Sequence, residues 1–465
     1  MAAPKFWSRL ASALAVAASL LIPPAQAHAQ GMSLIRDTEI EATLRGYLDP
    51  LIVAAGMEPK NVEFLLIGDK DLNAFAGPGV IGLHTGLILE SETPNQIQGV
   101  LAHEVGHLSG GHSARSGEMN RAGLRPFLLT MGLGVLAALA GSGEAAAGLV
   151  TSAPYFGTLG ALGHSREQEH RADQAGAQIL ERAGVSGKGL VEFFNNFRYQ
   201  EVFSEARRYA YFRSHPISSD RISALQAKVK TLPSYGKESP PEMVAEYDVM
   251  KAKLDGFLNP SVAITKYGEK DTSYPARYAR SIAYYQLKQP DKALKIIDEL
   301  LVEQPENAYL WELKGQILFE FGRAKEAEAP QRRSVELMPE APLLRINLGQ
   351  TLIALDDPAK LDEGIAELRR AVTQEDDNAV AWRLLATAYD RKGEEGLARL
   401  ATAEYNFAIG QAQEARVFAM RAREKLSKDT PQWRRATDIV LASQPSKEDL
   451  RDLAKEGSIA RGSIR

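Results

Sequence analysis

The sequence contains no cysteine among its 465 residues, and this absence excludes several classes of chemistry. A chain without thiols forms no disulfides, holds no iron–sulfur cluster, and has neither a cysteine nucleophile nor a thiolate zinc site. It also lacks the thiol that a diacyl lipid anchor requires. Histidine is scarce as well, with 8 residues, so any metal site must combine a few imidazoles with carboxylates.

The chain also lacks an excess of positive charge. Its 55 Lys and Arg residues face 59 Asp and Glu, a formal net charge of −4. This balance argues against nucleic acid as a partner, because nucleic-acid-binding proteins carry basic surfaces. With 45% hydrophobic residues there is ample material for large cores, and the length predicts two or three domains.

Residues 1–30 have the pattern of a secretory signal peptide. Lys5 and Arg9 precede an apolar stretch from Leu10 to Ile22, and a proline pair and small residues follow it. The apolar stretch is short for the ~30 Å of a bilayer core. We therefore expect a cleaved export signal, with an uncleaved membrane anchor as the alternative.

Two regions of different composition follow. Residues 31–260 are glycine-rich and varied, with short strand-like runs such as 62–67, whereas 261–465 are mostly helical in pattern. A Pro/Gly/Ser cluster at 232–241 is typical of a loop or linker between them.

The second region carries an internal repeat. Pro305 and Pro339 lie 34 residues apart, as do Gly315 and Gly349, and 34 residues is the tetratricopeptide period. A generic helical bundle is the alternative. Tetratricopeptide repeats stack into a solenoid whose concave surface binds peptides or partner proteins.

The strongest chemical signal is the H-E-x-x-H motif formed by His103, Glu104 and His107. On a helix this spacing places both imidazoles on one face, where they can bind one Zn²⁺, with Glu104 beside the metal-bound water. Thr93 and Gln96 predict the start of that helix by their capping spacing. The alternative is a pair of histidines on an ordinary core helix.

The site needs a third protein ligand, and we favour Glu169 because Asp173 follows it by one helical turn. Asp173 would accept the second N–H of a ligating histidine. His112, Glu167 and His170 are the alternative ligands. Two imidazoles and one carboxylate leave a fourth position for water, which is typical of a catalytic zinc site with one ion per chain.

At these residues the sequence resembles the HtpX/BepA family of gluzincin metallopeptidases. Four segments carry the resemblance, namely 103–107, 169–173, 73–87, and 213–216 with 221–222. The combination of export signal, peptidase region and repeats is similar to the BepA-like branch. That branch implies a periplasmic protease linked to outer-membrane protein assembly or quality control.

The resemblance also implies roles for two further segments. Residues 73–81 would form an edge strand that pairs with substrate backbone, with Asn73, Ala74 and Phe75 as substrate-binding residues. An ordinary hairpin is the alternative. His215, followed by Pro216, would stabilise the oxyanion or occupy the fourth zinc position in a resting state, and a plain loop histidine is the alternative.

The Gly/Ala-rich stretch 123–163 is interrupted by Glu144 and Pro154. Its apolar pieces are short for a membrane span. We favour a buried helical hairpin or a mobile lid, with peripheral membrane contact and a spanning segment as alternatives.

These observations predict an α+β, mainly helical chain: a gluzincin-type peptidase domain at 31–260 and an all-α repeat solenoid at 261–465. The predicted function is a periplasmic zinc endopeptidase acting on protein clients, with its repeats contacting outer-membrane assembly machinery. The alternative is a repeat-based chaperone or assembly factor whose protease activity is latent or secondary.

Overall fold

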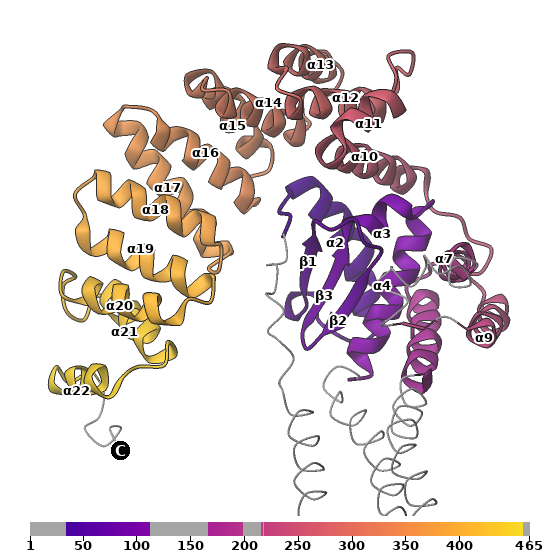
Figure 1. Ribbon diagram of the computed structural model, residues 1–465, viewed down its shortest axis with the longest axis horizontal. Coiled ribbons are helices and arrows are strands. Elements are labelled where there is room, and N and C mark those ends of the chain that lie inside the picture. The colour runs from indigo at the N-terminus through magenta and orange to yellow at the C-terminus, as the bar shows by residue number, and fades with distance from the viewer. Residues whose placement is uncertain (1–33, 112–165, 199–214, 217, 459–465) are drawn as a thin grey trace, which may run out of the picture.

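The computed structural model describes residues 34–111, 166–198, 215–216 and 218–458. A part that contains the sheet lies beside an array of paired helices, which begins above it and curves down along one side (Figure 1). The predicted mainly helical architecture, a mixed part followed by helical repeats, is confirmed.

Several predictions fall on residues outside these ranges: the export signal at 1–30, the insert at 123–163 and the alternative ligand His112. Among the described residues, no helix is long and apolar enough to cross a membrane.

A three-stranded sheet has the order β1-β3-β2. Strand β1 (Glu63–Ile67) runs parallel to the central strand β3 (Val80–His84), and β2 (Ala74–Gly77) runs antiparallel to it. Both β1 and β2 are therefore edge strands of the sheet.

The predicted strand at 73–81 is shorter than expected. Its first part forms β2, but Pro78 and Gly79 make a turn, and Val80 and Ile81 belong to β3. Proline cannot donate to a strand ladder, and Gly79 adopts a φ of +73°, which favours glycine. Strand β2 is thus an edge strand of the sheet and also one arm of a hairpin with β3.

Helix α2 (Thr38–Ala54) begins at Asp37, whose side chain accepts a hydrogen bond from the Ile40 backbone N–H at 2.9 Å. Ile40, Leu44 and Leu48 recur at helical spacing and are buried. They share one core with apolar side chains of β1, β3 and α4 (Pro94–Ser109). The short helix α3 (Thr85–Glu90) joins β3 to α4.

Glycines let other helices approach α4 closely. A Cβ on Gly99 would lie 2.6 Å from the backbone of α7 (Lys188–Arg198), and one on Gly106 would lie 2.8 Å from the Ala172 carbonyl oxygen. Ala172 belongs to a helix that covers 166–182, and α9 (Ser219–Lys230) packs on α7. The small side chains of α4 therefore bring the 166–182 helix within reach of its histidines.

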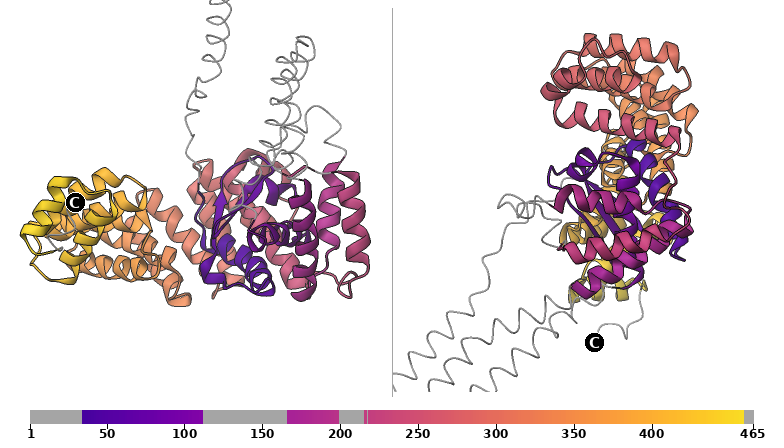
Figure 2. Two further views of the ribbon diagram at one scale, coloured as in Figure 1. Left: turned by 90° about the horizontal axis from the view of Figure 1, so that it is seen from below. Right: turned by 90° about the vertical axis from the view of Figure 1, so that its right-hand side faces the viewer.

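Helix α10 (Pro241–Leu258) contacts both parts of the chain. Tyr247, Met250 and Leu254 are buried in the core of the sheet-containing part, whereas Val249 and Phe257 pack against the first core of the repeats. The helices that follow are α11 (Pro260–Lys266), α12 (Tyr274–Gln286), α13 (Pro290–Glu303), α14 (Ala308–Glu320), α15 (Ala324–Leu337), α16 (Pro342–Ala354), α17 (Pro358–Gln374), α18 (Ala379–Arg391), α19 (Glu395–Ala408), α20 (Ala412–Arg423), α21 (Pro431–Ala442) and α22 (Lys447–Lys455). Figure 2 shows the later helices displaced to one side of the sheet-containing part.

Candidate metal centre

Helix α4 places His103 and His107 one turn apart on the same face. It begins after Thr93, whose side chain accepts a hydrogen bond from the Gln96 backbone N–H at 3.3 Å, so the predicted helix start is confirmed. The two Nε2 atoms lie 3.1 Å apart. His103 is completely buried, which keeps its ring in a fixed position.

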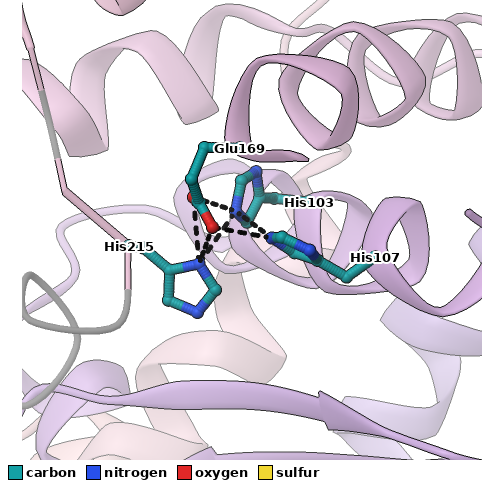
Figure 3. A group of neighbouring side chains, drawn as sticks. All are labelled: His103, His107, Glu169 and His215. Carbon is teal, nitrogen blue, oxygen red and sulfur yellow. Dashed lines mark hydrogen bonds and ion pairs between the residues drawn. The ribbon is translucent and has the colours of Figure 1, made fainter. Parts of the chain in front are cut away.

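The 166–182 helix supplies Glu169, which points at both imidazoles (Figure 3). Its Oε2 lies 3.4 Å from His103 Nε2, and its Oε1 lies 3.3 Å from His107 Nε2. The alternative ligands Glu167 and His170 are exposed to solvent. The structure therefore brings Glu169, and not these neighbours, to the histidine pair.

His215 joins this group from the segment before α9. Its Nδ1 lies 3.3 Å from His103 Nε2 and 3.1 Å from each oxygen of Glu169. The residue is 7% exposed, so it is not a solvated loop histidine. The donor atoms of His103, His107, Glu169 and His215 all lie within 4.8 Å of one another.

The spacing of these donors fits a tetrahedral cation. Donor atoms of His103 and Glu169 lie 3.1–3.4 Å from their neighbours in the cluster. In a tetrahedral site with bonds of about 2.0–2.1 Å, neighbouring ligand atoms lie about 3.3 Å apart. Three imidazoles and one carboxylate are also a donor set that suits a divalent transition metal.

Glu104 is fully buried next to this cluster. Among the described residues, neither of its carboxylate oxygens has a hydrogen-bond partner, and Oε1 lies 3.6 Å from His215 Nε2. A buried carboxylate without a donor is unfavourable on its own. The arrangement therefore fits a water or a substrate group between Glu104 and a bound cation.

Asp173 and Arg221 lie behind the cluster. Asp173 Oδ1 is 3.0 Å from Nδ1 of His103, and Arg221 donates two hydrogen bonds of 2.8 Å to the same carboxylate. Arg221 Nη1 also lies 3.1 Å from Glu169 Oε2. The sequence predicts no role for Arg221, which only forms part of a segment that resembles the family.

The charges of these groups are strongly coupled. Burial lowers the pKa of the His103 imidazole, but Asp173 and Glu169 more than offset this and raise it to about 10. Burial lowers the pKa of His107. Burial would raise the pKa of Glu169 and Asp173, yet their histidine and arginine partners hold both well below the usual range. Both carboxylates are therefore ionised and favour a bound cation.

The three predicted substrate-binding residues lie on or beside β2, which packs on α4. The ring of Phe75 lies against Gly82 of β3, where an added Cβ would be 2.3 Å from it. Asn73 Nδ2 is 3.5 Å from His84 Nε2, and Ala74 is buried. A role in substrate binding stays a prediction for these residues. That prediction assigns the contact with substrate to the backbone of β2.

Comparison with known proteins identifies two regions of the chain. Residues 38–229 match Peptidase family M48, and residues 278–342 match a tetratricopeptide repeat family. The chain carries a family M48 peptidase domain followed by tetratricopeptide repeats. It is thereby a metallopeptidase, and the predicted resemblance is confirmed.

Several known proteins are similar to this chain. It is 26% identical over 383 residues to the putative beta-barrel assembly-enhancing protease of Vibrio cholerae, covering 76% of this chain and 74% of the relative. It is 25% identical over 336 residues to the beta-barrel assembly-enhancing protease of Escherichia coli, covering 70% and 66%. Metalloprotease LoiP of Escherichia coli is 32% identical over 168 residues, which are 34% of this chain and 60% of LoiP.

Proposed function

We propose that this M48 protein is a zinc-dependent endopeptidase in which His103, His107 and Glu169 hold the metal. The observation that carries the proposal is the convergence of their donor atoms at 3.1–3.4 Å from one another. A zinc ion bound there would polarise the scissile carbonyl and lower the pKa of water to about 7. No thiolate ligand competes, because the chain has no cysteine.

Glu104 is the general base of the proposed reaction. Its buried carboxylate lies next to the donors of His103 and His107 and has no hydrogen-bond partner among the described residues. It takes a proton from the attacking water and passes it to the leaving amine as the peptide bond breaks.

His215 turns Nδ1, and not Nε2, toward the donor cluster. Of the two roles predicted for it, this orientation favours the fourth donor position in a resting enzyme. Displacement of His215 would open that position to a substrate carbonyl. The displaced imidazole could then stabilise the oxyanion.

Asp173 and Arg221 are positioning residues in this proposal. Asp173 Oδ1 pairs with the Nδ1 side of the His103 ring at 3.0 Å, so that Nε2 faces the metal. Arg221 neutralises Asp173 and reaches Glu169 as well. One buried guanidinium thus aligns ligands from two helices.

We propose folded or unfolded outer-membrane proteins as the clients, acted on in the periplasm. Two relatives that align with most of this chain are named beta-barrel assembly-enhancing proteases. The export-signal pattern at 1–30 supports the location.

A second candidate function is client binding by the repeats alone, as a chaperone or assembly factor. A large cleft between β1 and the repeats favours it, because none of the proposed metal ligands lines that cleft. The two functions are separable, since one depends on Glu104 and the other does not.

The deciding experiment measures cleavage of casein by the purified protein. We expect activity that a chelator abolishes and added zinc restores, and that Glu104→Gln eliminates while the folded state is retained. Activity that survives both treatments would contradict the proposed mechanism. The exposed Glu167→Gln is the matched control and should cleave casein normally.

A further inference from the structure

A cleft of about 1450 Å³ separates β1 from the repeats, and we call it the β1 cleft. Phe64 and Leu65 line one side, and side chains of α14, α15, α16, α18 and α19 line the other. None of the proposed metal ligands belongs to it. Because β3 separates β1 from β2, this edge of the sheet is not the one beside α4.

The backbone of β1 can accept another strand at Phe64. The Val62 carbonyl oxygen, just before β1, already accepts a hydrogen bond from Arg45 at 3.0 Å. The Glu63 N–H donates to the Gly79 carbonyl oxygen at 2.9 Å, so Glu63 faces β3. Backbone groups alternate along a strand, and those of Phe64 and Leu66 therefore point away from β3. Ile35 N–H already donates to Leu66 O at 2.9 Å, whereas the Phe64 backbone has no such partner among the described residues.

The β1 cleft is acidic. Six carboxylates line it besides Glu312, whose burial raises its pKa to about 8. The six are Asp37, Glu41, Glu63, Glu320, Glu375 and Asp377. Among the described residues of the lining Arg36 is the single basic one, and it pairs with Glu41 and Glu375, while Lys253 outside the lining pairs with Asp37. Glu63, Glu320 and Asp377 have no such ion pair among the described residues. An occupant with positive side chains is therefore favoured, and an acidic one is repelled.

Two buried polar groups in the lining lack partners. Gln331 and Thr351 are each 1% exposed, and among the described residues neither Gln331 Oε1 nor Thr351 Oγ1 has a hydrogen-bond partner. Gln331 Oε1 can only accept a hydrogen bond, so it fits an ammonium, a guanidinium or a backbone N–H. A buried acceptor without a donor is unfavourable until such a group arrives.

Apolar side chains around the cleft point to a protein occupant. Leu258 is 40% exposed, Val380 47% and Ile409 41%, and all three line the cleft. Exposed apolar groups gathered beside carboxylates match a segment that alternates apolar and basic residues, as an extended strand does. A helix has free backbone N–H groups only in its first turn, so it cannot pair along the edge of β1 as a strand does.

We propose that the β1 cleft binds an extended, basic segment of a partner protein, which adds to β1 at Phe64 and places its lysine or arginine side chains on the carboxylates. The segment would hold a client while another part of that client reaches the metal centre. Only the identification of the partner as a client of the protease rests on the proposed function. Binding itself needs neither metal nor Glu104.

The test measures fluorescence anisotropy of a labelled peptide of about ten alternating lysine and valine residues, a length that fills one strand. We expect saturable binding to the full-length protein, and none for a peptide of alternating glutamate and valine. The lysine–valine peptide with an N-methyl group on every residue should bind at least about tenfold more weakly, because it has no backbone donor left for the Phe64 carbonyl oxygen. Equal binding of both lysine–valine peptides would overturn the strand addition.

Variants of the protein locate the site. Glu63→Lys and Asp377→Lys should each weaken binding at least about fivefold, whereas Glu306→Lys, at an exposed position outside the lining, should not. Glu104→Gln should bind normally, so a failure of the proteolysis proposal is distinguishable from a failure of this one. Wild-type affinity in both cleft variants would overturn the proposal. So would a peptide-free dimer that Glu63→Lys dissolves, since a second copy would then fill the cleft.

Discussion

Asp173 lies between His103 and Arg221, 3.0 Å from the imidazole Nδ1 and joined to the guanidinium by two hydrogen bonds of 2.8 Å. The three residues come from α4, the 166–182 helix and α9, and all are buried. Because Asp173 engages Nδ1, it leaves Nε2 of His103 to face Glu169 and His107. The direction of one metal donor is thus set by a carboxylate that is itself held by Arg221.

Asp173→Asn tests this positioning role. Asparagine keeps the size of the side chain but removes the negative charge that orients His103, so zinc affinity should fall about 10- to 100-fold. Competition with a chromophoric chelator measures the change. Asp220→Asn, at an exposed position, is the control, and unchanged affinity in Asp173→Asn would refute the role.

Arg221→Gln should lower the free energy of unfolding by about 3 kcal/mol or more, because it leaves the Asp173 carboxylate buried without its cation. Urea unfolding in the presence of a chelator isolates this effect from metal binding. Arg171→Gln removes an exposed ion pair with Glu167 and should stay within about 0.5 kcal/mol of wild type. Similar values for both variants would show that Arg221 is dispensable.

Gly106→Ala should disturb the centre without touching a ligand. The new Cβ would lie 2.8 Å from the Ala172 carbonyl oxygen and push the 166–182 helix away from α4. We expect a loss of about 1–3 kcal/mol in stability together with weaker zinc binding. Gly46→Ala, with nothing within 4 Å of its Cβ, should instead stabilise α2 by about 0.5–1 kcal/mol.

Glu312 predicts a dependence of stability on pH. Burial raises its pKa to about 8, and the carboxylates of Asp37 and Glu39 act in the same direction. Lys253 and a hydrogen bond from Asn347 lower the pKa but do not cancel this rise. Between its ordinary pKa and 8 the folded state binds more protons than the unfolded state, so this group makes stability fall as pH rises.

Glu312→Gln removes the titrating carboxyl group and with it the fall in stability at higher pH. Urea unfolding at pH 5, 7 and 9 should show the variant gaining on wild type with pH, by at most about 1.4 kcal/mol per pH unit up to pH 8. Glu306→Gln, an exposed carboxylate, should show no such gain. A difference that stays constant across the three pH values would rule out the raised pKa.

The sequence predicted the parts of the centre that depend on local periodicity. His103 with His107, and Glu169 with Asp173, follow from spacings of four residues on helices, which put two side chains on one face. The role of Arg221 could not be predicted, because it contacts a residue 48 positions away across a helix packing that no local pattern encodes. Its place in a resembling segment was the one available signal.

The sheet and the β1 cleft were less predictable. The strand expected at 73–81 was divided because Pro78 and Gly79 form a turn, a signal that was present in the sequence. The cleft depends on how the repeats curve back toward β1, which arises from the summed packing of many helix pairs. A 34-residue period predicts such an array but not what its surface will face.

The zinc content of Glu169→Gln tests the central claim most directly. Mass spectrometry of the purified proteins should find one zinc per chain in the wild type and close to none in Glu169→Gln after dialysis. Glu167→Gln, two residues away and exposed, should keep its full zinc content. A Glu169→Gln protein that retains one zinc per chain would show that the metal is held elsewhere and would contradict the account.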